Sequence, residues 1–181
     1  MSIDLAANGL VGLTRDALVT LRSVLFRDAG ANAAAYLQEA GYAGGSRLYQ
    51  AFVAWSAAHG LPAPENIAAP DFERRAAEFF AELGWGAMAV STLNNAVLTL
   101  DSTNWAEADP SSAMEFPGCY LSAGLLADFF GRIAGTPLAV MEVECRSSGG
   151  QQCRFLLGSS EVMQHLYDEM ANGVDYREAA V

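Results

Sequence analysis

The sequence predicts an α+β fold, in which an antiparallel four-stranded sheet packs with helices. Two observations indicate this class. Before Trp85, apolar residues recur at three- and four-residue spacing between glycines, as in amphipathic helices; after it, short apolar runs flank tight turns, as in β-hairpins. Helices followed by paired strands are typical of an α+β plan. We expect one domain over residues 1–181, with a helical part at 1–84 and a core at about 85–172.

Four helices are expected in the first part, because glycine and proline signals divide its apolar pattern. In chain order they are 15–26 with Thr14 as N-cap, 32–40 ending at Gly41, a helix that carries Leu48, Phe52 and Trp55 and ends near Gly60, and 72–83 with Asp71 as N-cap.

Two hairpins are expected in the second part. Their strands are predicted at 86–92, 96–101, 138–145 and 152–157. The acidic stretch 106–116 indicates a loop, and a fifth helix should begin at Pro117, a favourable residue at a first helical position. A terminal helix capped by Ser159 should run to about Met170, and the last ten residues should fray.

Composition excludes several classes of function. A hydrophobic content of 52% argues against disorder, and a net charge of −11, with arginine as the only cation, leaves little attraction for nucleic acid or anionic lipid. No run of about 18 apolar residues is present, and the first residues lack a basic region followed by an apolar one. We therefore expect a cytoplasmic protein without a membrane span, in which disulfides are not expected.

Three cysteines lie in the last third of the chain. A hairpin turn centred on Gly149 places Cys145 opposite Cys153, and Cys119 lies near the start of the helix that leads into this hairpin. Three thiols and a carboxylate from Glu142 or Glu144 would suit a tetrahedral zinc ion.

A simpler interpretation of the same residues is that the cysteines are buried as small apolar side chains and both glutamates face solvent. A regular strand also points Glu142 and Cys145 to opposite faces. A metal site that includes Glu142 therefore requires a bulge, or a strand end, between these two residues.

The C-terminal part of the chain resembles the 4-vinyl reductase domain family. Relatives occur in bacteriochlorophyll biosynthesis proteins and in the sensor regions of phenol- and toluene-responsive activators, and the fold is shared with subunits of the Golgi-transport TRAPP complex and with nitric-oxide-sensing domains. The residues that carry the resemblance are Pro117-Gly118-Cys119, Gly124, Phe130, Gly135, Glu142-Val143-Glu144-Cys145-Arg146, Gly149 and Cys153-Arg154-Phe155.

The resemblance implies a structural zinc ion held by three cysteines and one glutamate. By the family's spacing the ligands are Cys119, Glu142, Cys145 and Cys153, which selects Glu142 over Glu144. Such a site carries a formal charge of about −2, so we expect counter-charge from Arg146 or Arg154, each of which follows a ligand cysteine. The alternative is that both arginines are solvated.

The resemblance also implies an apolar pocket between sheet and helices for a hydrophobic small molecule that is aromatic, acyl or tetrapyrrole-like. Core packing is the alternative role for each candidate. The candidate lining residues are Trp85, Met88, Leu98, Trp105, Tyr120, Phe129 and Val140. Neither His59 nor His165 stands where the phenol sensors use a histidine, which argues against phenol as the specific ligand.

Nothing in the sequence matches a catalytic triad, a dinucleotide-binding loop or a P-loop, so we expect a binding or sensory role rather than catalysis. The family resemblance implies a homodimer. Two alternatives remain, an accessory protein or enzyme of chlorophyll and tetrapyrrole metabolism and a scaffold in the manner of TRAPP.

Overall fold

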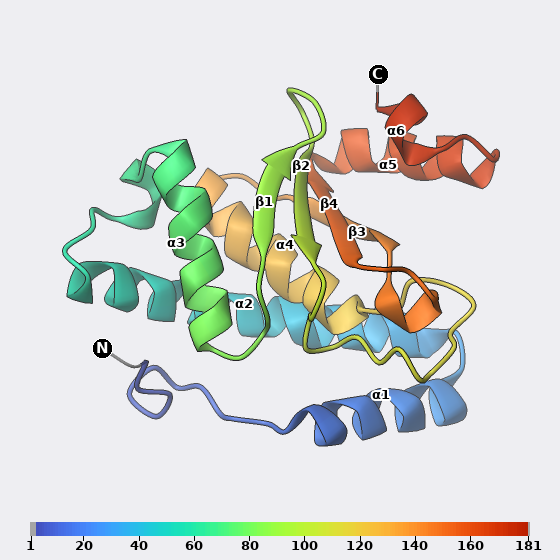
Figure 1. Cartoon of the computed structure of the whole chain (residues 1–181), viewed down its shortest axis with the longest axis horizontal. Helices are drawn as coiled ribbons and strands as arrows, with labels where there is room; N and C mark the ends of the chain where they lie inside the picture. Colours follow the sequence, from blue (N-terminus) through green and yellow to red (C-terminus); the bar gives the residue numbers. More distant parts are fainter. Residues whose placement is uncertain (1–2, 181) are drawn as a thin grey trace.

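The computed structural model describes residues 3–180 and has the predicted α+β class (Figure 1). One face of the sheet is covered by α4, behind which α2 lies, and the C-terminal helices pack against the other face. The elements are α1 (Arg15–Ala29), α2 (Asn32–Ala58), η1 (Pro64–Asn66), α3 (Ala69–Glu82), β1 (Ala89–Thr92), β2 (Leu98–Ser102), α4 (Tyr120–Ala134), β3 (Ala139–Glu144), η2 (Arg146–Ser148), β4 (Cys153–Gly158), α5 (Ser160–Ala171) and α6 (Tyr176–Ala179).

The sheet has the order β1-β2-β4-β3, and every pair is antiparallel. The two predicted hairpins therefore lie side by side and are joined through β2 and β4, where Leu98 pairs with Leu157 and Ser102 with Cys153. This order places β4 inside the sheet and leaves β3 at an edge, next to α4.

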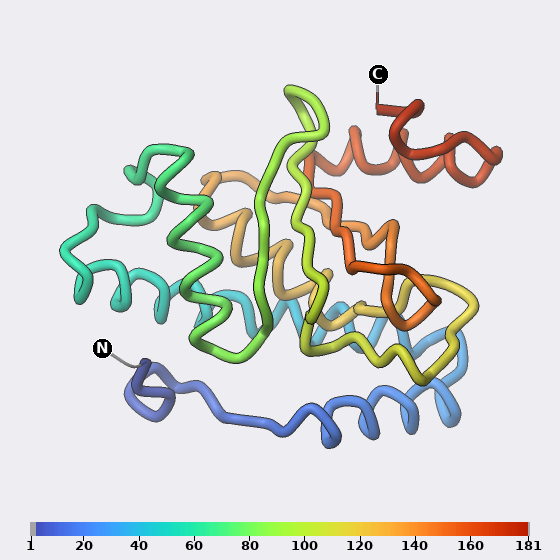
Figure 2. Tube along the Cα trace, viewed as in Figure 1, coloured from blue at the N-terminus to red at the C-terminus, as the bar shows by residue number. Residues whose placement is uncertain are grey.

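The predicted end of a helix at Gly41 is wrong. Residues 32–58 form one 27-residue helix, whose trace runs unbroken behind α4 (Figure 2). A Cβ atom at Gly41 would lie 2.0 Å from the carbonyl oxygen of Leu121, and one at Gly124 would lie 2.0 Å from that of Gln38. These glycines let the backbones of α2 and α4 touch, so here glycine marks close helix packing rather than a helix end.

The helix starts follow their capping chemistry. The predicted N-caps Thr14 and Ser159 are confirmed, since each hydroxyl accepts a hydrogen bond from a first-turn amide at 3.3 Å. Asp71 is not a cap, because α3 begins at Ala69 with a proline in its first turn. Helix α4 begins at Tyr120 rather than at Pro117, with Cys119 as its N-cap residue.

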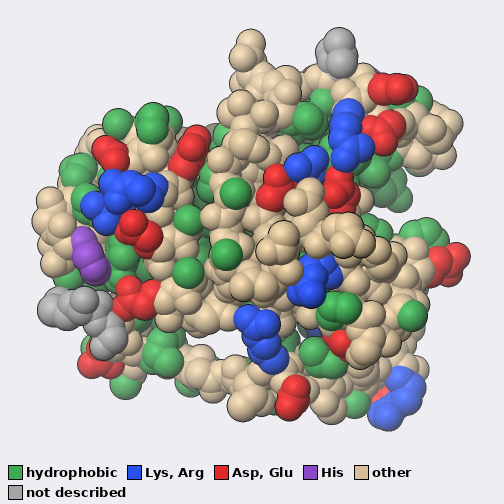
Figure 3. Space-filling model, viewed as in Figure 1, with side chains coloured by type: hydrophobic (Ala, Val, Ile, Leu, Met, Phe, Trp, Pro, Cys, Tyr) green, Lys and Arg blue, Asp and Glu red, His purple; other side chains and the backbone are tan. Residues whose placement is uncertain are grey.

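The predicted fraying of the tail is also wrong for the described residues, although Val181 lies outside them. Tyr176 is only 5% exposed, and its hydroxyl donates to Glu144 and accepts from Arg154. Arg154 also forms a two-bond ion pair with Asp101. Figure 3 shows acidic and basic side chains together where the sheet meets the C-terminal helices. This polar network holds α6 against the sheet.

Aromatic side chains dominate the main core, which lies between α2, α3, α4 and the sheet. Phe52, Phe79, Phe80 and Phe129 are fully buried and in mutual ring contact. Truncation of one buried Phe typically costs about 3–5 kcal/mol, so this cluster fixes the position of α4 over the sheet. Among the described helices, none has an apolar stretch long enough to cross a bilayer.

Two alanine substitutions within α2 test the role assigned to its glycines. Gly41→Ala should destabilise the protein by about 1–3 kcal/mol or more, because the new methyl group overlaps backbone atoms of α4. Gly44→Ala is the matched control: nothing lies within 4 Å of the added Cβ, so it should stabilise the helix by about 0.5–1 kcal/mol. Urea unfolding would measure both effects, and equal changes in the two variants would contradict the packing role.

Candidate functional site

The four predicted ligands lie together where α4, β3 and β4 meet. Cys119 precedes α4, Cys145 directly follows β3, Cys153 begins β4, and Glu142 lies within β3. One ligand atom from each residue lies within 4.8 Å of all the others, and the three cysteines are buried. The cluster can hold a metal ion, and it brings together segments up to 34 residues apart in the chain.

A β-bulge turns Glu142 toward the thiols, as the sequence requires for a site that contains it. Glu144 pairs with Arg154, in the register predicted for a turn centred on Gly149, whereas Glu142 pairs with Phe155 one step out of that register. The pairing shifts between the two glutamates. Because a bulge adds one residue to one strand, residues 142 and 145 can face the same site.

The atoms of the cluster leave ligand positions free. The sulfur of Cys119 lies 3.7 Å from that of Cys145 and 4.0 Å from that of Cys153. Oε2 of Glu142 accepts the backbone N–H of Cys119 at 2.8 Å, whereas Oε1 is buried with no hydrogen-bond partner. A buried carboxylate oxygen without a partner is costly, and a cation would satisfy it.

Glu144 lies outside this cluster. Its carboxylate accepts hydrogen bonds from Gln152 at 3.0 Å, from Arg177 at 2.6 Å and from the Tyr176 hydroxyl. The structure therefore groups Glu142 with the thiols and Glu144 with the C-terminal helix.

Protonation within the cluster is uneven. Hydrogen bonds from the Cys119 and Cys153 thiols hold the pKa of Cys145 well below its ordinary value. The hydrogen bond from Cys119 to Cys145 raises the pKa of Cys119 well above its ordinary value, since Cys119 is the donor. Burial, together with the Cys145 charge, raises the pKa of Glu142 to about 8. Metal binding at such a cluster would release protons, because ligands bind in their deprotonated forms.

The two arginines expected beside the cluster differ in their surroundings. Arg154 alternates with Cys153 along β4, and its guanidinium bonds Asp101 at 2.7 and 2.8 Å and Tyr176 at 2.8 Å. The donor to a ligand sulfur is instead a backbone group, since the N–H of Ser147 points to Cys145 at 3.3 Å. Arg146 lies in the same η2 turn, at the surface side of the hairpin.

The sequence analysis missed a buried ion pair beside the cluster. Glu107 is fully buried, and its carboxylate accepts the backbone amides of Leu121 and Ser122 at 3.1 and 2.7 Å, so it caps the start of α4. Arg22 lies 3.6 Å from this carboxylate and is 3% exposed. A signal was present, since Arg22 follows Leu18 by four residues and therefore shares the apolar stripe of α1.

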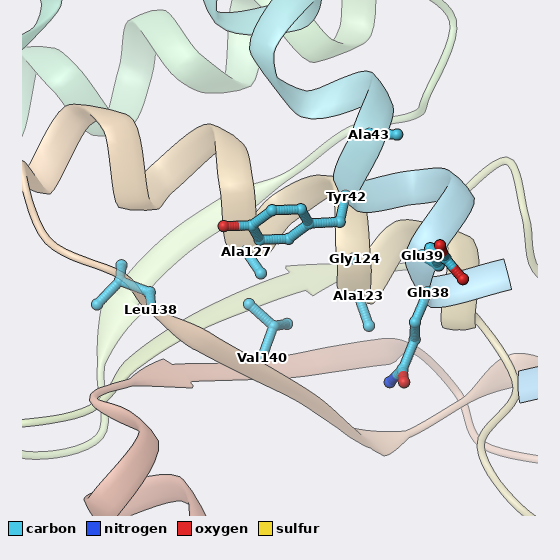
Figure 4. A pocket seen from close by; sticks show the side chains of 9 residues that line it. All are labelled: Gln38, Glu39, Tyr42, Ala43, Ala123, Gly124, Ala127, Leu138 and Val140. Carbon is cyan, nitrogen blue, oxygen red and sulfur yellow. The ribbon is translucent and has the colours of Figure 1, made fainter. Parts of the chain in front are cut away.

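An open groove of about 520 Å³ lies between α2, α4 and the edge strand β3 (Figure 4). Its floor consists of small residues of α4, and Tyr42 extends across it toward β3. Its lining is mostly apolar, with polar groups from α2. The lining residues are Gln38, Glu39, Tyr42, Ala43, Ala123, Gly124, Ala127, Leu138 and Val140.

The seven predicted lining residues do not share one cavity. Val140 lines the open groove, and Met88 and Trp105 line a separate void of about 150 Å³ that is too narrow to admit a water molecule. The others pack elsewhere: Trp85 stacks on Trp105 at 5.5 Å, Tyr120 contacts Phe26, and Phe129 and Leu98 pack in or against the main core. The Ala and Gly residues that form the groove were missed because a cavity depends on absent side chains.

Residues 106–159 match the family model of the vinyl-4-reductase domain. This segment contains all four clustered ligands, and the match confirms the predicted resemblance to the 4-vinyl reductase domain family. An uncharacterized protein from Methanocaldococcus jannaschii is 31% identical over 78 residues, which make up 43% of this chain and 41% of that protein. The chain thus matches less than half the length of this relative.

Two solved structures share the fold. The phenol-responsive sensory domain of the transcription activator PoxR, solved with phenol, superposes with a TM-score of 0.67 at 17% identity, over 90% of this chain and 82% of that one. A trafficking protein particle complex subunit 3 from Naegleria fowleri, covalently bound to palmitic acid, gives a TM-score of 0.57 at 13% identity, over 80% and 91% of the two chains. The similarity is therefore one of architecture.

Proposed function

We propose that this chain is a sensory binding domain for a hydrophobic small molecule, with a structural zinc ion beside the binding groove. One observation carries the proposal: the groove and the metal cluster share two walls. Helix α4 starts at the Cys119 cap, and Ala123 lines the groove one turn later. In β3, Val140 lines the groove, and Glu142 follows two residues on, on the same face.

Zinc is the metal that the ligand set favours. Tetrahedral coordination by three cysteines and one carboxylate suits zinc, and Zn–S bonds of about 2.3 Å imply sulfur separations of about 3.8 Å. The separations of 3.7 and 4.0 Å from Cys119 support this assignment. Four protein ligands leave no position for a substrate, so the ion would connect α4 to the hairpin rather than catalyse a reaction.

The charge of the proposed site would be offset in part by nearby donors. Three thiolates, one carboxylate and Zn²⁺ sum to a formal charge of about −2. The backbone amides of Cys119 and Ser147 already point to ligand atoms, at 2.8 and 3.3 Å. We retain Arg146 as the candidate for ionic compensation, because Arg154 is bonded to Asp101.

The groove favours an apolar ligand with one polar end. Its volume lies within the range of about 300–1,000 Å³ that is typical of small-molecule sites. Ala123, Ala127 and Val140 offer apolar surface, while Gln38 and Tyr42 offer hydrogen bonds at the rim. The similar folds were solved with phenol and with palmitic acid, which fit this description and are the first probes to use.

Elemental analysis with two matched variants tests the metal site. Protein purified without chelator should hold about one zinc per chain, and its three thiols should react only after denaturation in chelator. Glu142→Gln should weaken zinc binding because it removes a ligand carboxylate, whereas Glu144→Gln, two residues along the same strand, should leave it unchanged. Metal-free protein with freely reactive thiols would refute the zinc proposal.

Binding of phenol and palmitate, measured by calorimetry and native mass spectrometry, tests the groove. Ala127→Leu should reduce affinity at least about tenfold, because the larger side chain fills space between α4 and β3. Ala134→Leu adds the same group at an exposed position of the same helix and should bind like the original protein. Equal affinity in the two variants would place the ligand elsewhere, and no binding of either probe would reject both as ligands.

A further inference from the structure

Helix α1 is attached to the rest of the molecule through few buried side chains. Of its 15 residues only Leu18 and Arg22 are buried, and Leu21 is 49% exposed. The helix runs along one border of the molecule in Figure 1, and Figure 3 shows an opening between part of the N-terminal segment and the body. Arg22 is therefore a main connection between α1 and the core.

The partners of Arg22 all belong to the segment that ends at the metal cluster. One terminal nitrogen donates to the carbonyl of Glu107, and the other donates to the carbonyl of Gly118 at 3.0 Å and to the sulfur of Met114 at 3.2 Å. Gly118 directly precedes the candidate ligand Cys119. Arg22 thus holds three points of the chain between residues 107 and 118.

The same arginine acts on Cys119 from a second direction, through the Glu107 side chain. The Glu107 carboxylate, 3.6 Å from Arg22, accepts both backbone amides and the hydroxyl that open α4, from Leu121 and Ser122. The Ser122 hydroxyl in turn accepts from the Trp105 ring nitrogen at 2.7 Å. Cys119 therefore lies between a carbonyl held by Arg22 and a helix start held by the carboxylate that Arg22 faces.

We propose that Arg22 is a positioning residue for the metal centre and that it couples the docking of α1 to metal binding. The coupling rests on the proposed zinc site. Because such coupling is reciprocal, a zinc ion that binds the ordered Cys119 segment more tightly must favour docked α1 by the same factor. The N-terminal helix would then report the state of the metal centre to whatever lies beyond it.

Hydrogen–deuterium exchange on the unmodified chain, with zinc and after chelation, is the first test. Removal of zinc should increase amide exchange in α1 as well as in the 107–121 segment and the β3–β4 hairpin. If the hairpin responds while α1 exchanges identically in both states, the coupling is wrong although the zinc site stands. A chain that takes up no zinc would overturn both proposals.

Arg22→Met provides the second test, with Arg15→Met, an exposed position of the same helix, as the control. In Arg22→Met, zinc affinity measured by chelator competition should fall about tenfold, at the lower end of the range for residues that orient ligands. The exchange of α1 should also become independent of zinc, a change that a purely structural role would not produce. Arg22→Lys should restore part of the affinity. Unchanged zinc affinity and a retained α1 response in Arg22→Met would overturn the proposal, and Arg15→Met should behave like the original chain.

Should Arg22→Met fail to fold because Glu107 is left buried without its partner, the double variant Arg22→Met with Glu107→Gln removes both charges. It should fold, because a neutral amide still accepts a helix amide, and it should retain the weakened zinc affinity. Zinc affinity equal to that of the original chain in this double variant would overturn the positioning role.

Discussion

The direct contact between the backbones of α2 and α4 is the constraint on which the rest of the structure depends. Gly41 and Gly124 bring the two helices together without intervening side chains, and Gly45 lies equally close to Asp128. This contact sets the height of α4 over the sheet, and thereby the depth of the aromatic core and the position of Cys119 at the start of the helix. It also explains the groove, because small residues on this part of α4 leave space beside β3.

Helix α4 connects the features that matter for function. Its start is held by two carboxylates from outside the helix, Glu142 at the Cys119 amide and Glu107 at the next free amides. Negative groups at a helix N-terminus are stabilised by its unpaired N–H groups and by its dipole. One of these carboxylates belongs to the metal cluster, while the other joins the cluster to α1. A ligand that moved α4 against β3 would therefore strain the cluster as well.

The sequence predicts the features that depend on short spacing and periodicity. Cys145 and Cys153 meet because one turn relates them, and a bulge beside Glu142 follows from strand alternation alone. The misinterpretation of Gly41 has a physical origin, because the same residue type permits both a helix end and a close helix contact, and only the partner helix distinguishes them. Glu107 could not be recognised within an acidic loop, since its burial depends on Arg22, 85 residues earlier.

The bulge in β3 has an evolutionary consequence. This strand serves two different partners on its two faces, with Glu142 toward the thiols and Glu144 toward the tail helix, and the extra residue lets both arrangements coexist. A one-residue deletion at Val143 would give the strand a regular alternation and change which glutamate faces each partner. Length variation in this short strand should therefore be strongly selected against, while substitutions that keep its length, even at Val143 itself, remain open to drift.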